Sequence, residues 1–233
     1  MALFHSPSPA SSGLLLLMDA SNPKTTSGTN APNIGGGGQN ATTIGSPDLI
    51  TNEGNFNFWR YDGTNDAHRN EVVMGYEFTV VTIMKNRGTT WNDYSAPGSN
   101  RKANGYIMHA DPNTSNISYY VIGNGNQTYT YVGGSGSISS INTWRMYSFT
   151  SNGSNSHKAY VDDTVVLNSS TALSTARNNP NTTVSVDSIA EDSDLISTRK
   201  SDCDIVYHAI WDRQFSDQEI YDLWRERKER YGI

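Results

Sequence analysis

This sequence has a single cysteine, no excess of cationic residues and no long hydrophobic run. Cys203 is the only cysteine among 233 residues, which excludes intrachain disulfides and metal sites built from several thiolates. The 17 Lys and Arg are outnumbered by 23 Asp and Glu, so no basic stripe is present to neutralise phosphates, and we expect no nucleic acid partner. The apolar run at residues 14–18 is far shorter than the ~20 residues of a membrane helix, and no Lys or Arg precedes it. We therefore expect neither a signal peptide nor membrane insertion.

The overall composition is that of a globular protein. Hydrophobic residues make up 35% of the chain and charged residues 17%, which distinguishes it from membrane proteins and disordered chains. One all-β sandwich commonly uses ~200 to 250 residues. We therefore expect an extended, proline-bearing arm over residues 1–12 and a single domain over residues 13–233.

Short segments with the pattern of β-strands recur along the chain. Residues 14–18 are apolar at every position, as in a strand buried on both sides. Apolar and polar residues alternate with period two in several others, as in strands with one face toward a core. These segments are residues 78–84, 127–132, 144–149, 184–186 and 205–211. Glycine, asparagine and serine fill the connections, and residues 24–46 are predicted to be one long loop. The pattern predicts an all-β, antiparallel two-sheet sandwich of the jelly-roll type.

Two local motifs are more specific. Residues 160–165 predict a hairpin with a two-residue turn, in which Asp163 would adopt the positive φ usually given to glycine. Ser216 followed by Glu219 predicts a capping box, and Ile220, Leu223 and Trp224 then follow at the spacing of one helix face. We expect a C-terminal helix over residues 216–230 whose apolar side packs against its own domain.

The order of the motifs resembles the concanavalin A-like, laminin G-like jelly rolls. An opening strand that ends in Asp19-Ala20 is followed by Tyr61-Asp62-Gly63-Thr64-Asn65-Asp66, then by Asn142-Thr143-Trp144-Arg145, by Tyr160-Val161-Asp162-Asp163 and by a closing segment at residues 210–220. Within that family, versions with a short closing helix look most like virion proteins of tailed bacteriophages. The resemblance implies a tail-fibre, head-fibre or capsid decoration module located on the virion, some of which bind glycans.

Signals of catalysis are weak. Glycan hydrolysis calls for two carboxylates facing each other across the scissile bond, and catalytic members of the wider superfamily carry a Glu-x-Asp-x-x-Glu string that is absent here. The nearest acidic groupings are residues 191–194 and the pair Asp202 and Asp204. The five histidines are scattered, and we expect them in loops or edge strands. Cys203 is predicted to be a small buried residue and not a reactive thiol. We expect no enzymatic activity.

Two kinds of ligand are consistent with clusters of polar and aromatic residues. Calcium, the one candidate cofactor, could take oxygens from Asp62, Asn65 and Asp66, although such side chains in a turn usually bond to the local backbone. A glycan could stack on tyrosines and bond to neighbouring amides, and the densest such set is Tyr119, Tyr120, Asn124, Asn126, Tyr129 and Tyr131. Tyr129 and Tyr131 would share one strand face, an arrangement that also arises from cross-strand packing.

Residues 55–61 are aromatic on both faces of a predicted strand. Phe56 and Phe58 share one face, whereas Trp59 and Tyr61 share the other. A strand with one face in solvent should not be aromatic on both sides, so either another element of the chain or a neighbouring subunit covers the second face. We favour a subunit or virion contact at Phe56 and Phe58, and hence a homo-oligomer.

These features together predict a non-enzymatic structural or adhesion protein of a bacteriophage particle. Its partners would be other virion proteins and further copies of itself, with a cell-surface glycan as an additional partner. The alternative is a stand-alone carbohydrate-binding lectin domain, and a hydrolase comes third. The hydrolase comes last because the catalytic Glu-x-Asp-x-x-Glu string is absent.

Overall fold

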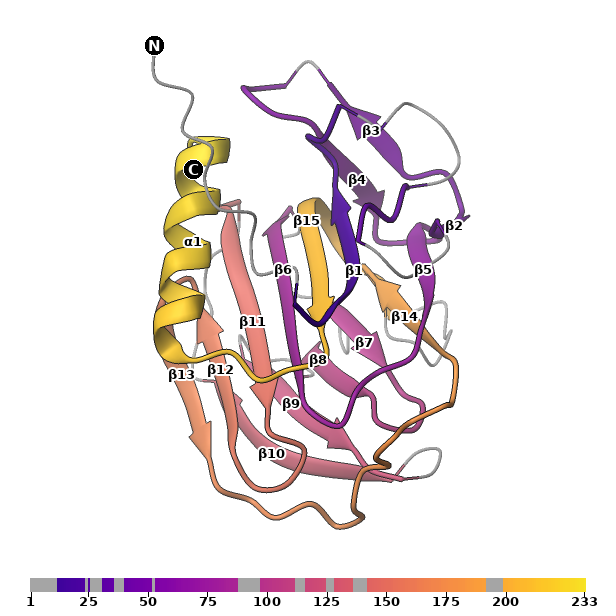
Figure 1. Cartoon of the computed structure of the whole chain (residues 1–233). Coiled ribbons are helices and arrows are strands. Elements are labelled where there is room, and N and C mark those ends of the chain that lie inside the picture. The colour runs from indigo at the N-terminus through magenta and orange to yellow at the C-terminus, as the bar shows by residue number, and fades with distance from the viewer. Residues whose placement is uncertain are drawn as a thin grey trace.

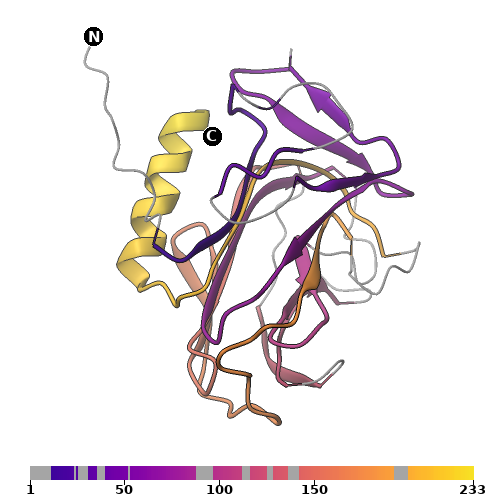
Figure 2. The same ribbon diagram turned by 45° about the vertical axis from the view of Figure 1, so that its right-hand side comes forward.

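The computed structural model describes residues 12–23, 25, 31–35, 40–51, 53–87, 97–111, 116–124, 128–135, 142–191 and 199–233. These residues form two antiparallel β-sheets stacked face to face, with one α-helix on the outside of the first sheet (Figures 1 and 2). The predicted fold class, a two-sheet β-sandwich with a C-terminal helix, is confirmed. None of the helical residues in the described part forms a segment long and apolar enough to cross a membrane. Most of the predicted arm lies outside the described residues.

The first sheet, sheet A, has eight strands in the described part of the chain. Its order is β13-β12-β11-β6-β15-β4-β3, and β1 pairs with the second half of β15. The bounds are β1 (Leu14–Asp19), β3 (Asp48–Ile50), β4 (Phe58–Asp62), β6 (Phe78–Asn86), β11 (Arg145–Ser151), β12 (His157–Val161), β13 (Thr164–Ser169) and β15 (Asp202–Trp211).

The second sheet, sheet B, has seven strands among the described residues, in the order β10-β9-β8-β7-β14-β5-β2. They are β2 (Thr42–Ile44), β5 (Ala67–Val72), β7 (Gly98–Asn100), β8 (Tyr106–Ala110), β9 (Ile117–Ile122), β10 (Tyr129–Ser135) and β14 (Ser185–Ile189). Strand β2 falls within residues 24–46, so the prediction of one long loop there is wrong in part. Its three residues are too few to show a period-two pattern in the sequence.

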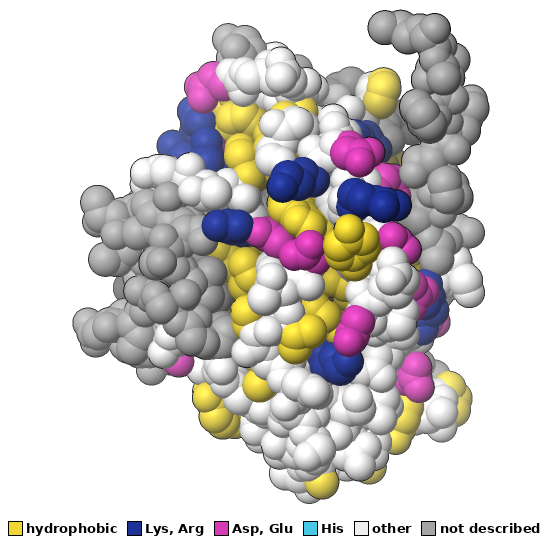
Figure 3. All heavy atoms as spheres, turned by 90° about the vertical axis from the view of Figure 1, so that its left-hand side faces the viewer, with side chains coloured by type: hydrophobic (Ala, Val, Ile, Leu, Met, Phe, Trp, Pro, Cys, Tyr) yellow, Lys and Arg dark blue, Asp and Glu magenta, His cyan; other side chains and the backbone are white. Residues whose placement is uncertain are grey.

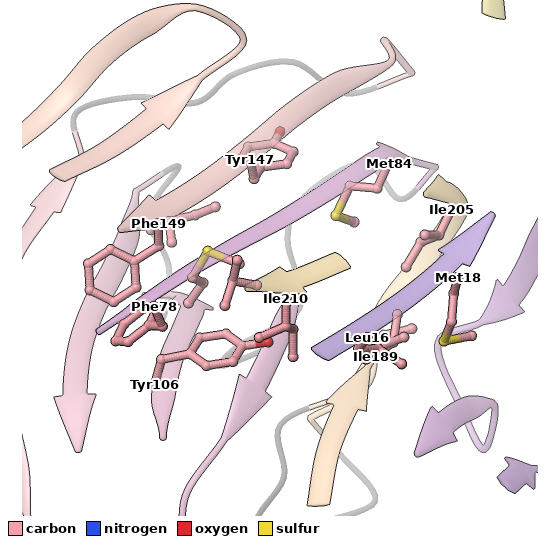
Figure 4. Close-up of a cluster of buried hydrophobic side chains, with 14 of the residues drawn as sticks. Leu16, Met18, Phe78, Met84, Tyr106, Tyr147, Phe149, Ile189, Ile205 and Ile210 are labelled. Carbon is pink, nitrogen blue, oxygen red and sulfur yellow. The ribbon is translucent and has the colours of Figure 1, made fainter. Parts of the chain in front are cut away.

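The core lies between the sheets, where side chains from both point toward one another (Figure 4). Phe149 of sheet A packs against Phe78 of the same sheet and Tyr119 of sheet B, each with ring centroids 5.3 Å apart. Strand β1 is buried on both sides as predicted, because Leu16 contributes to this core and Leu17 packs against the apolar cluster on the far side of sheet A.

A polar network also crosses the core. Asp187 on sheet B accepts a hydrogen bond from the Tyr106 hydroxyl (2.7 Å) and pairs with His208 Nε2 of sheet A (2.9 Å). His208 Nδ1 in turn lies 2.8 Å from the Thr82 hydroxyl. All four residues are fully buried, so this Thr-His-Asp arrangement has no route to a substrate. The expectation that the histidines lie in loops or edge strands is wrong for the four described ones. His208 occupies the central strand β15 and has buried partners, and inner strands β5, β8 and β12 carry His68, His109 and His157.

Helix α1 (Asp217–Tyr231) covers the outer face of sheet A. Its N-terminus has the predicted capping box, in which Ser216 and Glu219 exchange hydrogen bonds, and Gly232 ends it in the left-handed conformation. The predicted stripe of Ile220, Leu223 and Trp224 is buried against the sheet. Figure 3 shows the side of the molecule on which the helix lies, where acidic and basic side chains leave hydrophobic ones visible between them.

The β12–β13 hairpin forms where predicted, but its turn differs in one detail. Asp162, the first turn residue, has a φ of 59°, whereas Asp163 has no positive φ. Contacts with the neighbouring strand β11 hold Asp162 in place. Its carboxylate accepts a hydrogen bond from the Met146 backbone N–H (3.0 Å) and pairs with Arg145 (2.5 Å). Tertiary contacts to β11 therefore select which aspartate adopts the left-handed conformation.

Candidate functional site

The outer face of sheet B carries a row of side chains that crosses every strand of the sheet. Residues paired directly in an antiparallel sheet point to the same face. Following the pairs from β10 to β2, the row is Tyr131, Tyr120, Ile107, Ser99, Ser188, Arg69 and Thr42. The three middle members are buried, whereas Tyr131 and Thr42 at the ends are exposed. The face is therefore accessible at its two ends.

At the β10 end, three tyrosines form a surface that we call the tyrosine platform: Tyr120, Tyr129 and Tyr131. The Tyr131 side chain is 53% exposed and its ring centroid lies 5.2 Å from that of Tyr120. Tyr120 packs on His109 at the same centroid distance. Tyr129 lies two residues before Tyr131 on β10, hence on the same face, and the Arg101 guanidinium lies 5.2 Å from its ring. The platform offers partly exposed aromatic rings that pack against one another and against His109.

The other residues of the predicted glycan set are placed differently. Tyr119 is fully buried in the core, because adjacent strand residues point to opposite faces and Tyr120 takes the outer one. Its side chain has no surface for a ligand, and including it in the set was wrong. Asn124 is exposed just after β9, and Asn126 lies outside the described residues. The structure therefore groups three of the four predicted tyrosines.

The residues proposed for calcium make the backbone hydrogen bonds of a turn. Asp62 Oδ1 accepts from the N–H groups of Thr64 (2.8 Å), Asn65 (3.0 Å) and Asp66 (3.4 Å). Partial burial would raise the pKa of Asp62, but these hydrogen bonds lower it below its usual value. Asp66 accepts from the N–H groups of Ser46 (2.7 Å) and Asp62 (3.1 Å). In the part of the chain that is described, no three His, Cys, Asp or Glu side chains form a group suited to a metal ion.

The aromatic strand is covered on both faces by its own chain. Phe58 is 3% exposed, and Trp144 lies 5.5 Å from it between ring centroids. Phe56 is half-buried against Trp144 and Tyr231, each with a centroid distance of 5.3 Å. Other elements of the same chain therefore cover Phe58. Because Phe58 is buried in this way, little of its surface is left for the contact with a neighbouring subunit that we favoured from the sequence.

The acidic groupings are engaged in ion pairs. Asp204 is fully buried and lies 2.9 Å from both Arg60 Nε and Lys85 Nζ, while Asp202 pairs with Arg87 at 2.6 Å. Glu191 is also fully buried, whereas the three residues that follow it lie outside the described part. Burial raises the pKa of the Cys203 thiol between the two aspartates, as expected of an unreactive cysteine.

Several solved structures share this fold. Domain 4 of AbnA, an extracellular arabinanase from Geobacillus stearothermophilus solved in complex with arabinotriose, matches with a TM-score of 0.63 and 11% identity over 90% of this chain and 97% of that one. The binding domain of botulinum neurotoxin serotype D matches with a TM-score of 0.63 and 13% identity over 93% of this chain and 51% of that one. Trypanosoma rangeli sialidase matches with a TM-score of 0.62 and 14% identity over 93% of this chain and 33% of that one.

These likenesses show the fold. The chain spans about half the length of the botulinum binding domains that it matches. Neither a protein-family model nor the sequence of a curated protein matches it. The fold is thus shared with domains of toxins and glycan-processing enzymes, at identities of 11–14% in the three cases above.

Proposed function

We propose that this protein is a non-catalytic, glycan-binding adhesion module. The observation that carries the proposal is the tyrosine platform: Tyr131 is an exposed aromatic ring, backed by Tyr120, on a sheet face with buried middle positions. Flat aromatic rings bind the C–H faces of sugars, and the phenolic hydroxyls can bond to sugar hydroxyls. Arg101 beside Tyr129 adds hydrogen-bond donors at the same end of the sheet.

The structural neighbours support a glycan as the ligand. The arabinanase domain was solved with arabinotriose, and the botulinum domains are described as binding or receptor-binding domains. At these low identities no ligand contact transfers residue by residue. The proposed location, as a homo-oligomeric tail-fibre, head-fibre or decoration module of a tailed-phage particle, rests on the sequence resemblance alone.

A glycan array with the purified protein tests the proposal. We expect Tyr131→Ala and Tyr129→Ala each to weaken retention of the bound glycan at least tenfold, because each removes a stacking face. Tyr221→Ala is the matched control, since Tyr221 is an exposed tyrosine (43%) on helix α1, far from sheet B in the fold. Thermal melts must show that all three variants remain folded.

Other outcomes would favour other functions. Binding that the platform variants leave unchanged would contradict a role for the tyrosines. A negative array, combined with antibody labelling of intact phage particles, would favour a purely structural virion protein. Release of reducing ends from a polysaccharide panel would contradict the proposal that the module is non-catalytic.

A further inference from the structure

The opposite end of the same row holds a hollow of about 210 Å³. It lies against β2, β5 and β14, the last three strands of sheet B, and thus at the far edge from the tyrosine platform. Six strand-to-strand steps of about 4.8 Å separate Tyr131 from Thr42 along the row, a span of roughly 29 Å. The hollow is lined by Asn40, Thr42, Ile44, Arg69, Asn70, Glu71 and Val186.

The Arg69 side chain is held in place by an ion pair with Glu191. Its Nε and Nη2 donate to the two carboxylate oxygens of Glu191, at 2.5 and 3.2 Å. Glu191 is fully buried and also accepts from Lys200 Nζ at 2.5 Å. The bidentate pairing fixes the plane of the guanidinium. Its Nη1 group makes no hydrogen bond to the described residues and remains available as a donor.

The charges around the hollow cancel. Arg69 and Lys200 contribute two positive charges, and Glu191 and Glu71 contribute two negative ones. Glu71 is exposed and has no ion pair within the described part of the chain, so its carboxylate is a free acceptor. A phosphate, sulfate or carboxylate ligand would gain no net attraction at such a site and would be repelled by Glu71.

Apolar surface completes the hollow. Ile44 and Val186 are half-buried and present aliphatic walls on either side of β5. Pockets for drug-sized ligands measure roughly 300–1,000 Å³, so about 210 Å³ suits one small ring. A ligand with C–H faces, several hydroxyls and no charge matches this combination of aliphatic walls, one cationic donor and one anionic acceptor.

We propose that this hollow binds a single ring of a neutral sugar, as a second subsite of the module. The Arg69 guanidinium donates to one hydroxyl oxygen, Glu71 accepts from a neighbouring hydroxyl, and Ile44 and Val186 contact the C–H groups of the ring. The identification of the ligand as a glycan rests on the proposed function. Two subsites about 29 Å apart on one face would raise avidity for a branched or long glycan without any new contact.

Two-dimensional ¹⁵N NMR with monosaccharides tests the subsite. The probes are arabinose, glucose, galactose and mannose at up to ~100 mM, a range chosen because single-ring contacts commonly give Kd values near 1 mM or weaker. We expect at least one sugar to shift the backbone signals of β2, β5 and β14, equally in the Tyr131→Ala variant. Glucuronate and inorganic phosphate are expected to produce smaller shifts.

Two variants remove different features of the hollow. Thr42→Trp fills it from an exposed position on an edge strand, and Glu71→Ala removes the acceptor while keeping the ion pair of Arg69 with Glu191. Each is expected to weaken binding at least tenfold, and Glu71→Gln to weaken it less because the amide oxygen still accepts. Should Thr42→Trp unfold, Glu71→Ala still provides the test.

The results separate the subsite from the wider proposal. Absence of shifts with all four neutral sugars, shifts that neither variant alters, or stronger shifts with phosphate or glucuronate would each overturn the subsite. If the array signal is nevertheless lost in Tyr131→Ala, glycan binding at the platform stands alone. If sugars shift the hollow signals but the array shows no dependence on the platform tyrosines, the subsite stands and the platform does not.

Discussion

The outer faces of the two sheets differ in what covers them. The outer face of sheet A is covered by helix α1 from the same chain, which buries Ile220, Leu223 and Trp224 against it (Figure 2). The outer face of sheet B has no helix among the described elements, and side chains at both ends of its central row remain exposed. Sheet A is thus an apolar sheet that needs a cover, whereas sheet B can present polar and aromatic groups to a ligand at the two ends of its row.

The sequences of the strands explain this difference. Central strands β6 and β15 are apolar on both sides, so their outward residues, such as Val81, Ala209 and Trp211, require burial. Strands β5 and β14 point Arg69, Glu71 and Ser188 outward instead. The comparison predicts that substitutions under the helix cost stability, whereas those at the ends of the sheet B row affect ligand binding.

The largest loss of stability is expected from Trp211→Ala. Trp211 is fully buried beneath the helix, and its ring centroid lies 4.7 Å from that of Phe215. Removing it leaves a cavity, and the free energy of unfolding should fall by about 3–5 kcal/mol. Urea denaturation followed by circular dichroism measures this. Tyr221→Ala on the exposed side of the helix is the control, with an expected change within about 0.5 kcal/mol. Equal losses in both variants would contradict the proposed role of the helix as a cover.

Acid should also destabilise the fold, through a buried histidine. Burial lowers the pKa of His68 to about 3, while its Nδ1 lies 2.6 Å from the Tyr61 hydroxyl. The unfolded chain takes up a proton near pH 6.5, whereas the folded chain does so only near pH 3. The contribution of His68 to stability is therefore constant above about pH 6.5 and falls as the pH decreases toward 3, by about 2–3 kcal/mol at pH 4.5.

Denaturant titrations of the wild type and His68→Asn at several pH values test this linkage. Asparagine keeps a polar group near the position of Nδ1 and does not titrate, so the variant should lose less stability between pH 6.5 and 4.5. Burial also lowers the pKa of His157, which leaves a smaller slope of the same sign in the variant. Identical slopes in both proteins would show that His68 does not couple protonation to folding.

The fold was largely predictable because its signals are local. Period-two patterns identified β6, β11 and β15, and the capping box at Ser216 identified the helix, since each depends on residues a few positions apart. The polar core was not predictable in this way. His208 and Asp187 lie on different sheets and are joined only by the stacking of the two layers.

The candidate site was likewise predictable only where its residues are close in the sequence. Tyr120, Tyr129 and Tyr131 were found from the sequence because β9 and β10 are consecutive strands. The hollow was missed because Thr42, Arg69 and Val186 come from three strands spread over most of the chain. Alternation along β9 would have excluded Tyr119, since its neighbour Tyr120 cannot share its face.

A smaller loss of stability is expected at the turn between β4 and β5. Asp62→Ala removes an acceptor for three backbone N–H groups, and the free energy of unfolding should fall by about 1–2 kcal/mol. Asp62→Asn keeps one acceptor oxygen and should lose less.

The same turn tests for calcium. Because the carboxylates of Asp62 and Asp66 already accept backbone hydrogen bonds, we expect millimolar calcium to leave the melting temperature of the wild type unchanged relative to a chelator control. A calcium-dependent rise that disappears in Asp62→Ala would instead identify a metal site.

The smallest loss of stability is expected from Tyr131→Ala, the variant that should most affect glycan binding. Cross-strand aromatic pairs contribute about 0.2–1 kcal/mol, and the side chain of Tyr131 is 53% exposed, so its contact with Tyr120 is the main one lost. Urea denaturation should place this variant within about 1 kcal/mol of the wild type. A loss as large as that of Trp211→Ala would mean that the tyrosines act mainly as packing for sheet B, and the contrast between a covered sheet A and a ligand-presenting sheet B would fail.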